Sequence, residues 1–124
     1  MRITSAESQI MEALWRRAEP LTTEEIVAEV GPAQDWALGT VRTLINRLLK
    51  KKAVEGLRDG ARYLYRPLVA REQYVLSESR GLLDRLFDGE VTPLVAHFAR
   101  HEALSPQDIK KLKRLIEELD DGRE

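Results

Sequence analysis

The chain has 124 residues, enough for one or two small domains, and its 43% hydrophobic and 33% charged residues are typical of a folded, soluble, mostly helical protein. It contains no cysteine, which excludes disulfides, thiol redox switches and thiolate metal sites. No run of residues is apolar over the length that spans a bilayer, and the first seven residues lack the apolar core of a secretory signal. We therefore expect a cytoplasmic protein with no membrane insertion.

The formal net charge of −1 hides a strong asymmetry along the chain. Between Arg42 and Arg71 there are nine cations and only two anions, so the remainder is net acidic. A basic stripe on an otherwise acidic protein suits contact with the phosphates of nucleic acid. A charge run is more often only a solvated helix face, however, so the stripe does not decide the function by itself.

Two amphipathic helices are predicted at the start of the chain. Apolar residues recur at helical spacing over Ser5–Arg17, where the first residue is a suitable N-cap. A shorter helix follows, with Thr22 or Thr23 as its cap and two glutamates in its first turn, where the helix dipole favours acids. Gly31-Pro32 is expected to end this second helix.

A third helix is predicted over Trp36–Lys52, with Asp35 as its N-cap. One face of this helix is apolar and is expected to be buried: Leu38, Val41, Leu44, Ile45, Leu48 and Leu49. The other face is polar and basic: Thr40, Thr43, Arg47 and Lys50. Both Trp36 and the earlier Trp15 lie beside apolar stripes and are predicted to be core residues.

A basic β-hairpin is predicted to follow the third helix. Two strand-like runs, Val54–Arg58 and Arg62–Arg66, surround Asp59-Gly60, which is a strong signal for a hairpin turn. Side chains alternate along a strand, so Tyr63 and Tyr65 should share one face. Three helices followed by a basic hairpin are the order of a winged helix-turn-helix domain, so the predicted fold class is mainly α with a small β wing.

The remainder of the chain is predicted to be all-helical. Helical patterns cover Tyr74–Phe87 and Thr92–His101, and Ser105-Pro106 is a helix start. We expect a winged helix domain over residues 1–70 and a helical domain over residues 71–124. Three short helices form a poor independent core, so their apolar faces should pair with a second copy. The predicted dimerisation residues are Tyr74, Leu82, Leu83, Leu86, Phe87, Leu94, Phe98, Leu112, Leu115 and Leu119.

The third helix has the residue types of a DNA-reading helix. Such a helix needs small polar residues toward its N-terminal half, for base edges, and cations to hold phosphates. Thr40 and Thr43 fit the first role. The cations expected at the phosphates are Arg42, Arg47, Lys50 and Lys51 on the helix and Arg62 on the wing. The predicted partner is double-stranded DNA.

The sequence also bears on other classes of function. Winged helices also serve as protein-interaction modules, and this is the alternative function. An enzyme is not expected, because the chain has no phosphate-binding glycine motif, nucleophile elbow or metalloprotease motif. His97 and His101 have the spacing of a metal pair, but no third ligand is suitably spaced. We therefore expect no metal and no cofactor.

Four segments resemble the BlaI/MecI family of penicillinase repressors. WALGTVRTLINRLLKKK (36–52) is similar to the family's W-S-P-x-T-V/I-x-T-L-L/I-x-R-L-x-K-K-G, and SAESQIMEALW (5–15) resembles S-x-A-E-W-x-V/I-M-x-x-I/L-W. YLYRP (63–67) resembles Y-x-Y-x-P, and LVAHFARHEALSPQDIKKLKRLIEEL (94–119) resembles the family's C-terminal pattern. The resemblance covers nearly the whole chain in register.

The resemblance implies a dimeric transcriptional repressor that binds inverted-repeat operators and controls a β-lactamase-type or stress-response operon, with antibiotic resistance as the family association. It also implies a pathway in which a membrane sensor metalloprotease leads to cleavage within the C-terminal domain, which here corresponds to the bond between His97 and Phe98. The chain departs from the pattern at Ala37-Leu38, in place of Ser-Pro. It also departs at Gly39, which would let DNA approach the helix backbone closely.

Overall fold

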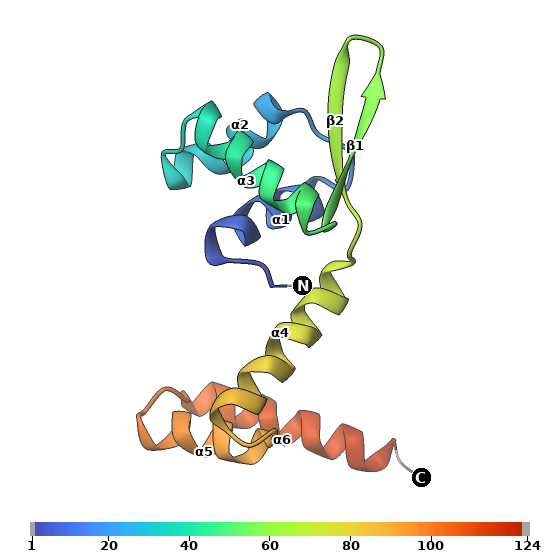
Figure 1. Cartoon of the computed structure of the whole chain (residues 1–124). Helices are drawn as coiled ribbons and strands as arrows, with labels where there is room; N and C mark the ends of the chain where they lie inside the picture. The colour runs from blue at the N-terminus through green and yellow to red at the C-terminus, as the bar shows by residue number, and fades with distance from the viewer. Residues whose placement is uncertain (1, 123–124) are drawn as a thin grey trace. The chain divides into compact units, whose positions relative to one another are not determined.

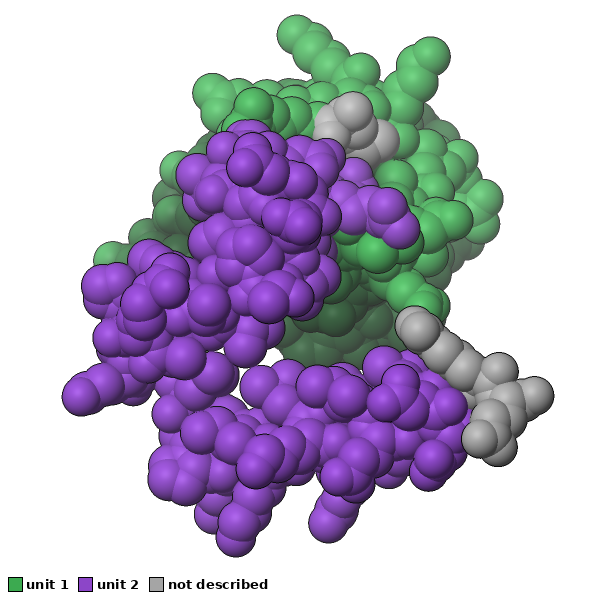
Figure 2. Space-filling model, turned by 90° about the horizontal axis from the view of Figure 1, so that it is seen from below, with its two compact units in different colours: residues 1–76 green, residues 77–124 purple. Residues whose placement is uncertain are grey.

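The computed structural model describes residues 2–122, and these form two compact units that meet between Leu76 and Ser77 in the sequence (Figures 1 and 2). Each unit is described by itself. The first contains three helices, a two-stranded antiparallel hairpin and the start of a fourth helix, and the second is helical. The winged helix order predicted from the sequence is confirmed by this arrangement.

Capping boxes start the first two helices. In α1 (Ser5–Arg17) the cap is Thr4, one residue before the predicted Ser5, and its hydroxyl accepts from the Glu7 N–H while the Glu7 carboxylate accepts from the Thr4 N–H. The reciprocal pair needs an acid three residues after the cap, which Thr4 has and Ser5 lacks. In α2 (Thr23–Gln34) the cap is Thr22, one of the two predicted candidates, and it pairs with Glu25 in the same way.

The predicted end of α2 at Gly31-Pro32 is wrong, because the helix continues to Gln34. Proline forfeits one backbone hydrogen bond, but its fixed φ is close to the helical value, so one more turn can form. Asp35 ends the helix in the left-handed conformation (φ 56°), and its N–H donates to the Gly31 carbonyl. Asp35 therefore closes α2.

The predicted N-cap of the third helix is consequently wrong as well. In α3 (Leu38–Lys50) the cap is Ala37, which has no side chain that can bond the first N–H groups. The helix ends where Lys52 adopts a positive φ of 61° and the Ala53 N–H donates to the Leu48 carbonyl. The predicted burial is confirmed for Val41, Leu44, Ile45 and Leu48, whereas Leu49 is half-buried and Leu38 is exposed.

The wing consists of β1 (Val54–Asp59) and β2 (Arg62–Pro67), paired from Val54 opposite Pro67 to Asp59 opposite Arg62. The two-residue loop has Gly60 first, at φ 64°, a conformation that glycine adopts without steric cost. Tyr63 and Tyr65 lie on one face, with ring centroids 5.3 Å apart. Tyr65 also exchanges two backbone hydrogen bonds with Leu21, which fixes the wing to the segment between α1 and α2.

The core of the first unit lies where α1, α2 and α3 meet the base of the wing. Its fully buried side chains include Ile10, Leu14, Leu21, Ile26 and Leu48. Both tryptophans, predicted as core residues, are partly buried and pack against this cluster. The indole N–H of Trp15 donates to the Val69 carbonyl at 2.9 Å, and its ring lies 5.4 Å from that of Tyr74.

The later helices are α4 (Arg71–Leu86), α5 (Val91–Arg100) and α6 (Pro106–Asp121). Asp88 and Gly89, which follow the end of α4, both have positive φ angles. Ser105 caps α6 and forms a capping box with Asp108, as predicted. None of the described residues of these three helices is fully buried.

Candidate nucleic-acid interface

The exposed face of α3 brings most of the predicted helix contacts together. Val41, Leu44, Ile45 and Leu48 hold one side of the helix in the core. The opposite side exposes Thr40, Arg42, Thr43, Arg47 and Lys50. The structure therefore presents small polar residues along the helix and cations on either flank, an arrangement that can meet base edges and phosphates together.

Asn46 belongs to this face, although it is not among the residues predicted to contact DNA. It is exposed, three residues after Thr43 and four before Lys50, so the three residues lie on one ridge that points away from the core. Asparagine can bond the N6 and N7 edge of adenine with two hydrogen bonds. The signal that could have found it is the helical spacing itself, since the buried stripe already fixes which positions lie opposite.

The hydroxyl of Thr43 is oriented by the helix. It donates to the carbonyl of Gly39, one turn earlier, at 3.0 Å. With its proton engaged, the oxygen can still accept a hydrogen bond, and the methyl group can make apolar contacts. Thr43 is therefore suited to an amino donor or to a thymine methyl in the major groove.

The nine cations between Arg42 and Arg71 fall into two sets. Four of them pair with carboxylates: Lys51 with Glu7, Arg62 with Asp59, Arg66 with Glu55 and Arg71 with Glu12. The other five form no ion pair with the described residues: Arg42, Arg47, Lys50, Lys52 and Arg58. Three of the five lie on α3, so the unneutralised charge is concentrated on its exposed face.

Lys51, one of the predicted DNA contacts, is engaged inside the protein. Its ammonium lies 2.5 Å from Glu7 Oε1, and the Glu7 side chain is 0% exposed. Burial by itself raises the pKa of the Glu7 carboxyl, but hydrogen bonds from Lys51 and Thr4 outweigh that effect and lower the pKa below its ordinary value. The pair joins the start of α1 to the end of α3, and it positions the helix instead of adding free charge to its outer face.

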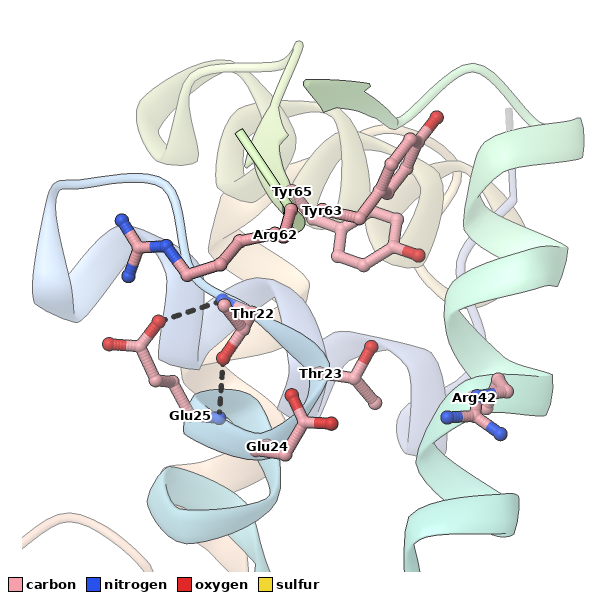
Figure 3. Close-up of a pocket in the computed structure, with 9 residues that line it drawn as sticks. Thr22, Thr23, Glu24, Glu25, Arg42, Arg62, Tyr63 and Tyr65 are labelled. Atoms are coloured by element: carbon pink, nitrogen blue, oxygen red, sulfur yellow. Dashed lines mark hydrogen bonds between the residues drawn. The ribbon is translucent and has the colours of Figure 1, made fainter. Parts of the chain in front are cut away.

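A hollow of about 570 Å³ separates the start of α2 from α3 and the wing (Figure 3). It is lined by Thr22, Thr23, Glu24, Glu25, Arg42, Ala61, Arg62, Tyr63 and Tyr65. Hydrogen bonds from the backbone and side chain of Thr22 lower the pKa of Glu25, so this carboxyl is ionised at neutral pH. The Arg62 guanidinium is 2.9 Å from Asp59 and both side chains are largely exposed, so this pair can open toward a stronger anion.

The predicted dimerisation residues divide by exposure. Leu86, Phe98, Leu115 and Leu119 are exposed, between 44% and 66%, and the described helices α5 and α6 also expose Val91, Ile109 and Ile116. Half-buried positions are Leu82, Leu83, Phe87, Leu94 and Leu112. Tyr74 packs against the core of the first unit, beside Trp15.

The bond between His97 and Phe98 lies within α5, and both side chains are exposed. The His97 and His101 rings have centroids 4.6 Å apart. Within residues 2–122, no group of three side chains is arranged to hold a metal ion. In the same part of the chain, no helix combines the length and the apolar character needed to cross a bilayer.

Comparison with known proteins gives a consistent result over nearly the whole chain. The family model for the penicillinase repressor matches residues 3–118. The transcriptional regulator BlaI of Mycobacterium tuberculosis is 30% identical over 122 residues, which cover 98% of this chain and 87% of the relative. The penicillinase repressor of Bacillus licheniformis is 27% identical over 117 residues, covering 94% and 91% of the two chains.

A solved structure with the same N-terminal fold contains DNA. The monomeric form of Bacillus licheniformis BlaI in complex with the blaP half-operator aligns with a TM-score of 0.53 and 27% identity, over 60% of this chain and 89% of that one. These relatives are named as repressors and regulators, not as enzymes. The chain belongs to the penicillinase repressor family, because the family model matches residues 3–118 and a relative named BlaI is 30% identical over nearly the whole chain.

Proposed function

We propose that this protein is a transcriptional repressor that binds duplex operator DNA through α3 and the wing. The observation that carries the proposal is the exposed face of α3, where Thr40, Thr43 and Asn46 lie among cations that have no carboxylate partner in the described structure. The BlaI relative in complex with a half-operator supports the same use of this fold.

The residues of the interface have distinct roles in this proposal. Thr40, Thr43 and Asn46 face base edges in the major groove. Arg42, Arg47 and Lys50 hold phosphates on either side, and Arg62 exchanges Asp59 for a phosphate as the wing approaches the backbone. Lys51 is left out, because its charge is compensated by a buried carboxylate.

Salt dependence tests the proposal against the alternative of a protein-interaction module. The chain is used to select duplexes from a random-sequence library, and the affinity for a selected duplex is then measured between 50 and 200 mM salt. Neutralising about four phosphates per subunit releases counterions and should weaken the binding of one subunit to its half-site about a hundredfold over this range, and the binding of a dimer more steeply. If no duplex is selected, or if the affinity does not change with salt, the interaction-module function is favoured.

The proposal includes a homodimer acting on an inverted-repeat operator. Support comes from the apolar side chains exposed on the second unit and from the charges of α6. Four cations lie in the middle of the helix, Lys110, Lys111, Lys113 and Arg114, and four anions lie toward its end, Glu117, Glu118, Asp120 and Asp121. The helix dipole disfavours the anions at that end, so they are better placed beside cations of another helix. A second α6 lying antiparallel places cations beside anions and covers the apolar stripe.

Sedimentation at micromolar concentration measures the oligomeric state directly. The expected mass is twice the 14.2 kDa of one chain. A mass of one chain throughout this range would contradict the dimer while leaving binding to a single half-site intact.

We further propose that the repressor controls a β-lactamase-type operon and is released when a membrane sensor metalloprotease pathway leads to cleavage between His97 and Phe98. Relatives named for penicillinase and for methicillin resistance support control of a β-lactamase-type operon.

The exposure of the His97 and Phe98 side chains supports the access of a protease to the bond between them. The helix must unwind locally before the protease can bind it. Mass spectrometry of the chain from cells exposed to a β-lactam should show a fragment ending at His97, and an intact chain during induction would contradict release by this cut.

A further inference from the structure

Gly39 is a helical glycine that the fold of this chain does not require. It is the second residue of α3 and is exposed. A Cβ added there meets no atom within 4 Å, and among the glycines of the described structure only Gly60 and Gly89 have positive φ. Alanine favours a helix over glycine, so neither packing nor backbone conformation explains the residue.

The position of Gly39 places it at the proposed DNA surface. It lies one turn before Thr43, whose hydroxyl donates to its carbonyl at 3.0 Å. Asn46 and Lys50 follow on the same ridge of the helix, and all four residues of the ridge are exposed. The missing side chain therefore leaves a notch at the start of the ridge that points directly away from the core.

We propose that Gly39 is a specificity-determining residue, and this inference rests on the proposed function. The notch lets a base edge approach the backbone of the first helical turn, close enough for Thr43 to contact the same base pair. Since the Thr43 proton is held by the Gly39 carbonyl, the base pair must offer an amino donor or a thymine methyl. A side chain at position 39 fills this space and prevents the contact.

The test compares Gly39→Ala with the native chain on two duplexes at one salt concentration. One duplex is selected by the native chain from a random library, and the other has its half-sites scrambled. The variant should keep or raise the thermal midpoint, because alanine stabilises the helix and meets no neighbour. Its affinity for the selected duplex should fall about tenfold or more, which is the usual effect of losing one base contact, with the scrambled duplex unchanged.

Gly81→Ala is the matched control, because Gly81 also lies within a helix and its added Cβ also meets nothing within 4 Å. It should leave both DNA affinities unchanged. The inference is overturned if Gly39→Ala binds the selected duplex like the native chain, or if it weakens both duplexes equally. Failure of the native chain to select any duplex is a different outcome, and it contradicts the proposed function itself.

Discussion

The two units of the molecule differ in where their apolar side chains lie. In the first, α1, α2, α3 and the wing cover one another, and Ile10, Leu14 and Leu48 are at most 1% exposed. In the second, α5 and α6 have apolar stripes just as regular, yet Leu115, Ile116 and Leu119 are each at least half exposed. The first unit completes its core within one chain, whereas the second leaves apolar side chains exposed, and the proposed second copy would cover them.

The charges of the units differ in a similar way. In the first unit, ion pairs compensate the cations around the base of the fold and leave those on α3 free. In the second unit, α6 carries its cations between Lys110 and Arg114 and most of its anions between Glu117 and Asp121. The proposed DNA contact uses the charges of the first unit, and the proposed dimer uses those of the second.

The largest expected effect comes from charging the exposed stripe of α6. Leu115→Asp with Leu119→Asp places two carboxylates in the proposed interface, and two central interface side chains together contribute about 4 kcal/mol. The dimer dissociation constant should rise about a thousandfold, and sedimentation should show a monomer. The unfolding of the first unit should not change, because neither residue contributes to its core.

Gln107→Asp is the control for added charge, since Gln107 is an exposed polar residue in the first turn of the same helix. It should leave the dimer intact. If the double variant remains dimeric, the exposed stripe of α6 is not the interface, and the contrast between the two units loses its explanation.

The next effect concerns the buried pair in the first unit. Lys51→Met removes the cation that compensates the fully buried Glu7 carboxylate, whose Oε2 has no hydrogen-bond partner in the described structure. The free energy of unfolding should fall by about 2–4 kcal/mol. Lys50→Met, on the adjacent exposed lysine without an ion pair, should change it by less than about 0.5 kcal/mol. Equal effects of the two variants in urea denaturation would contradict a stabilising role for the pair.

The same pair predicts a pH dependence of stability. The pKa of Glu7 is lowered in the folded state from its unfolded value near 4.5, so its contribution is complete above that value and is lost as the pH falls through the lower folded pKa. Native stability should therefore decrease below about pH 4.5. The difference between native chain and Lys51→Met should shrink over the same range, because a protonated Glu7 no longer needs a cation. If the difference in unfolding free energy between the two chains did not change with pH, protonation of Glu7 would not be the cause of the pH dependence.

Local patterns predicted much of the fold. The spacing of Val41, Leu44, Ile45 and Leu48 identified the buried face of α3, and the Asp-Gly pair identified the hairpin. Ser105-Pro106 identified the start of α6. These features depend on residues within about one helical turn or one reverse turn of each other, so the sequence contains them directly.

Features that depend on distant residues were not predictable in this way. The pairing of Lys51 with Glu7 joins residues 44 positions apart, and the bridge between Leu21 and Tyr65 likewise forms only in the folded chain. Asp35 was assigned to the wrong helix because a short acidic residue can follow one helix as well as precede the next. The sequence does not show which cations between Arg42 and Arg71 form ion pairs, because their carboxylate partners are brought close only by the fold.

Two substitutions on α3 with smaller expected effects should distinguish contacts to bases from contacts to phosphates. Thr43→Ala removes a base contact and should reduce the preference for a selected duplex by about 1 kcal/mol. Lys50→Ala should weaken selected and scrambled duplexes alike and lower the slope of log affinity against log salt by about 1. Fluorescence titrations at several salt concentrations measure both quantities. A loss that is the same on every duplex for both variants would show that the ridge is assigned wrongly.

The smallest expected effect comes from removing the N-cap of one helix in each unit. Thr22 and Ser105 make equivalent capping boxes, with Glu25 and Asp108, and replacing either cap with alanine should cost about 1 kcal/mol of helix stability. In the first unit, Thr22→Ala should lower the unfolding free energy by that amount and leave the dimer unchanged. In the second, Ser105→Ala should raise the dimer dissociation constant about fivefold, since the stability of α6 and its pairing with a second copy are linked. If Ser105→Ala does not change dimerisation, α6 is already stable within one chain, and the second unit is less dependent on its partner than its exposed side chains indicate.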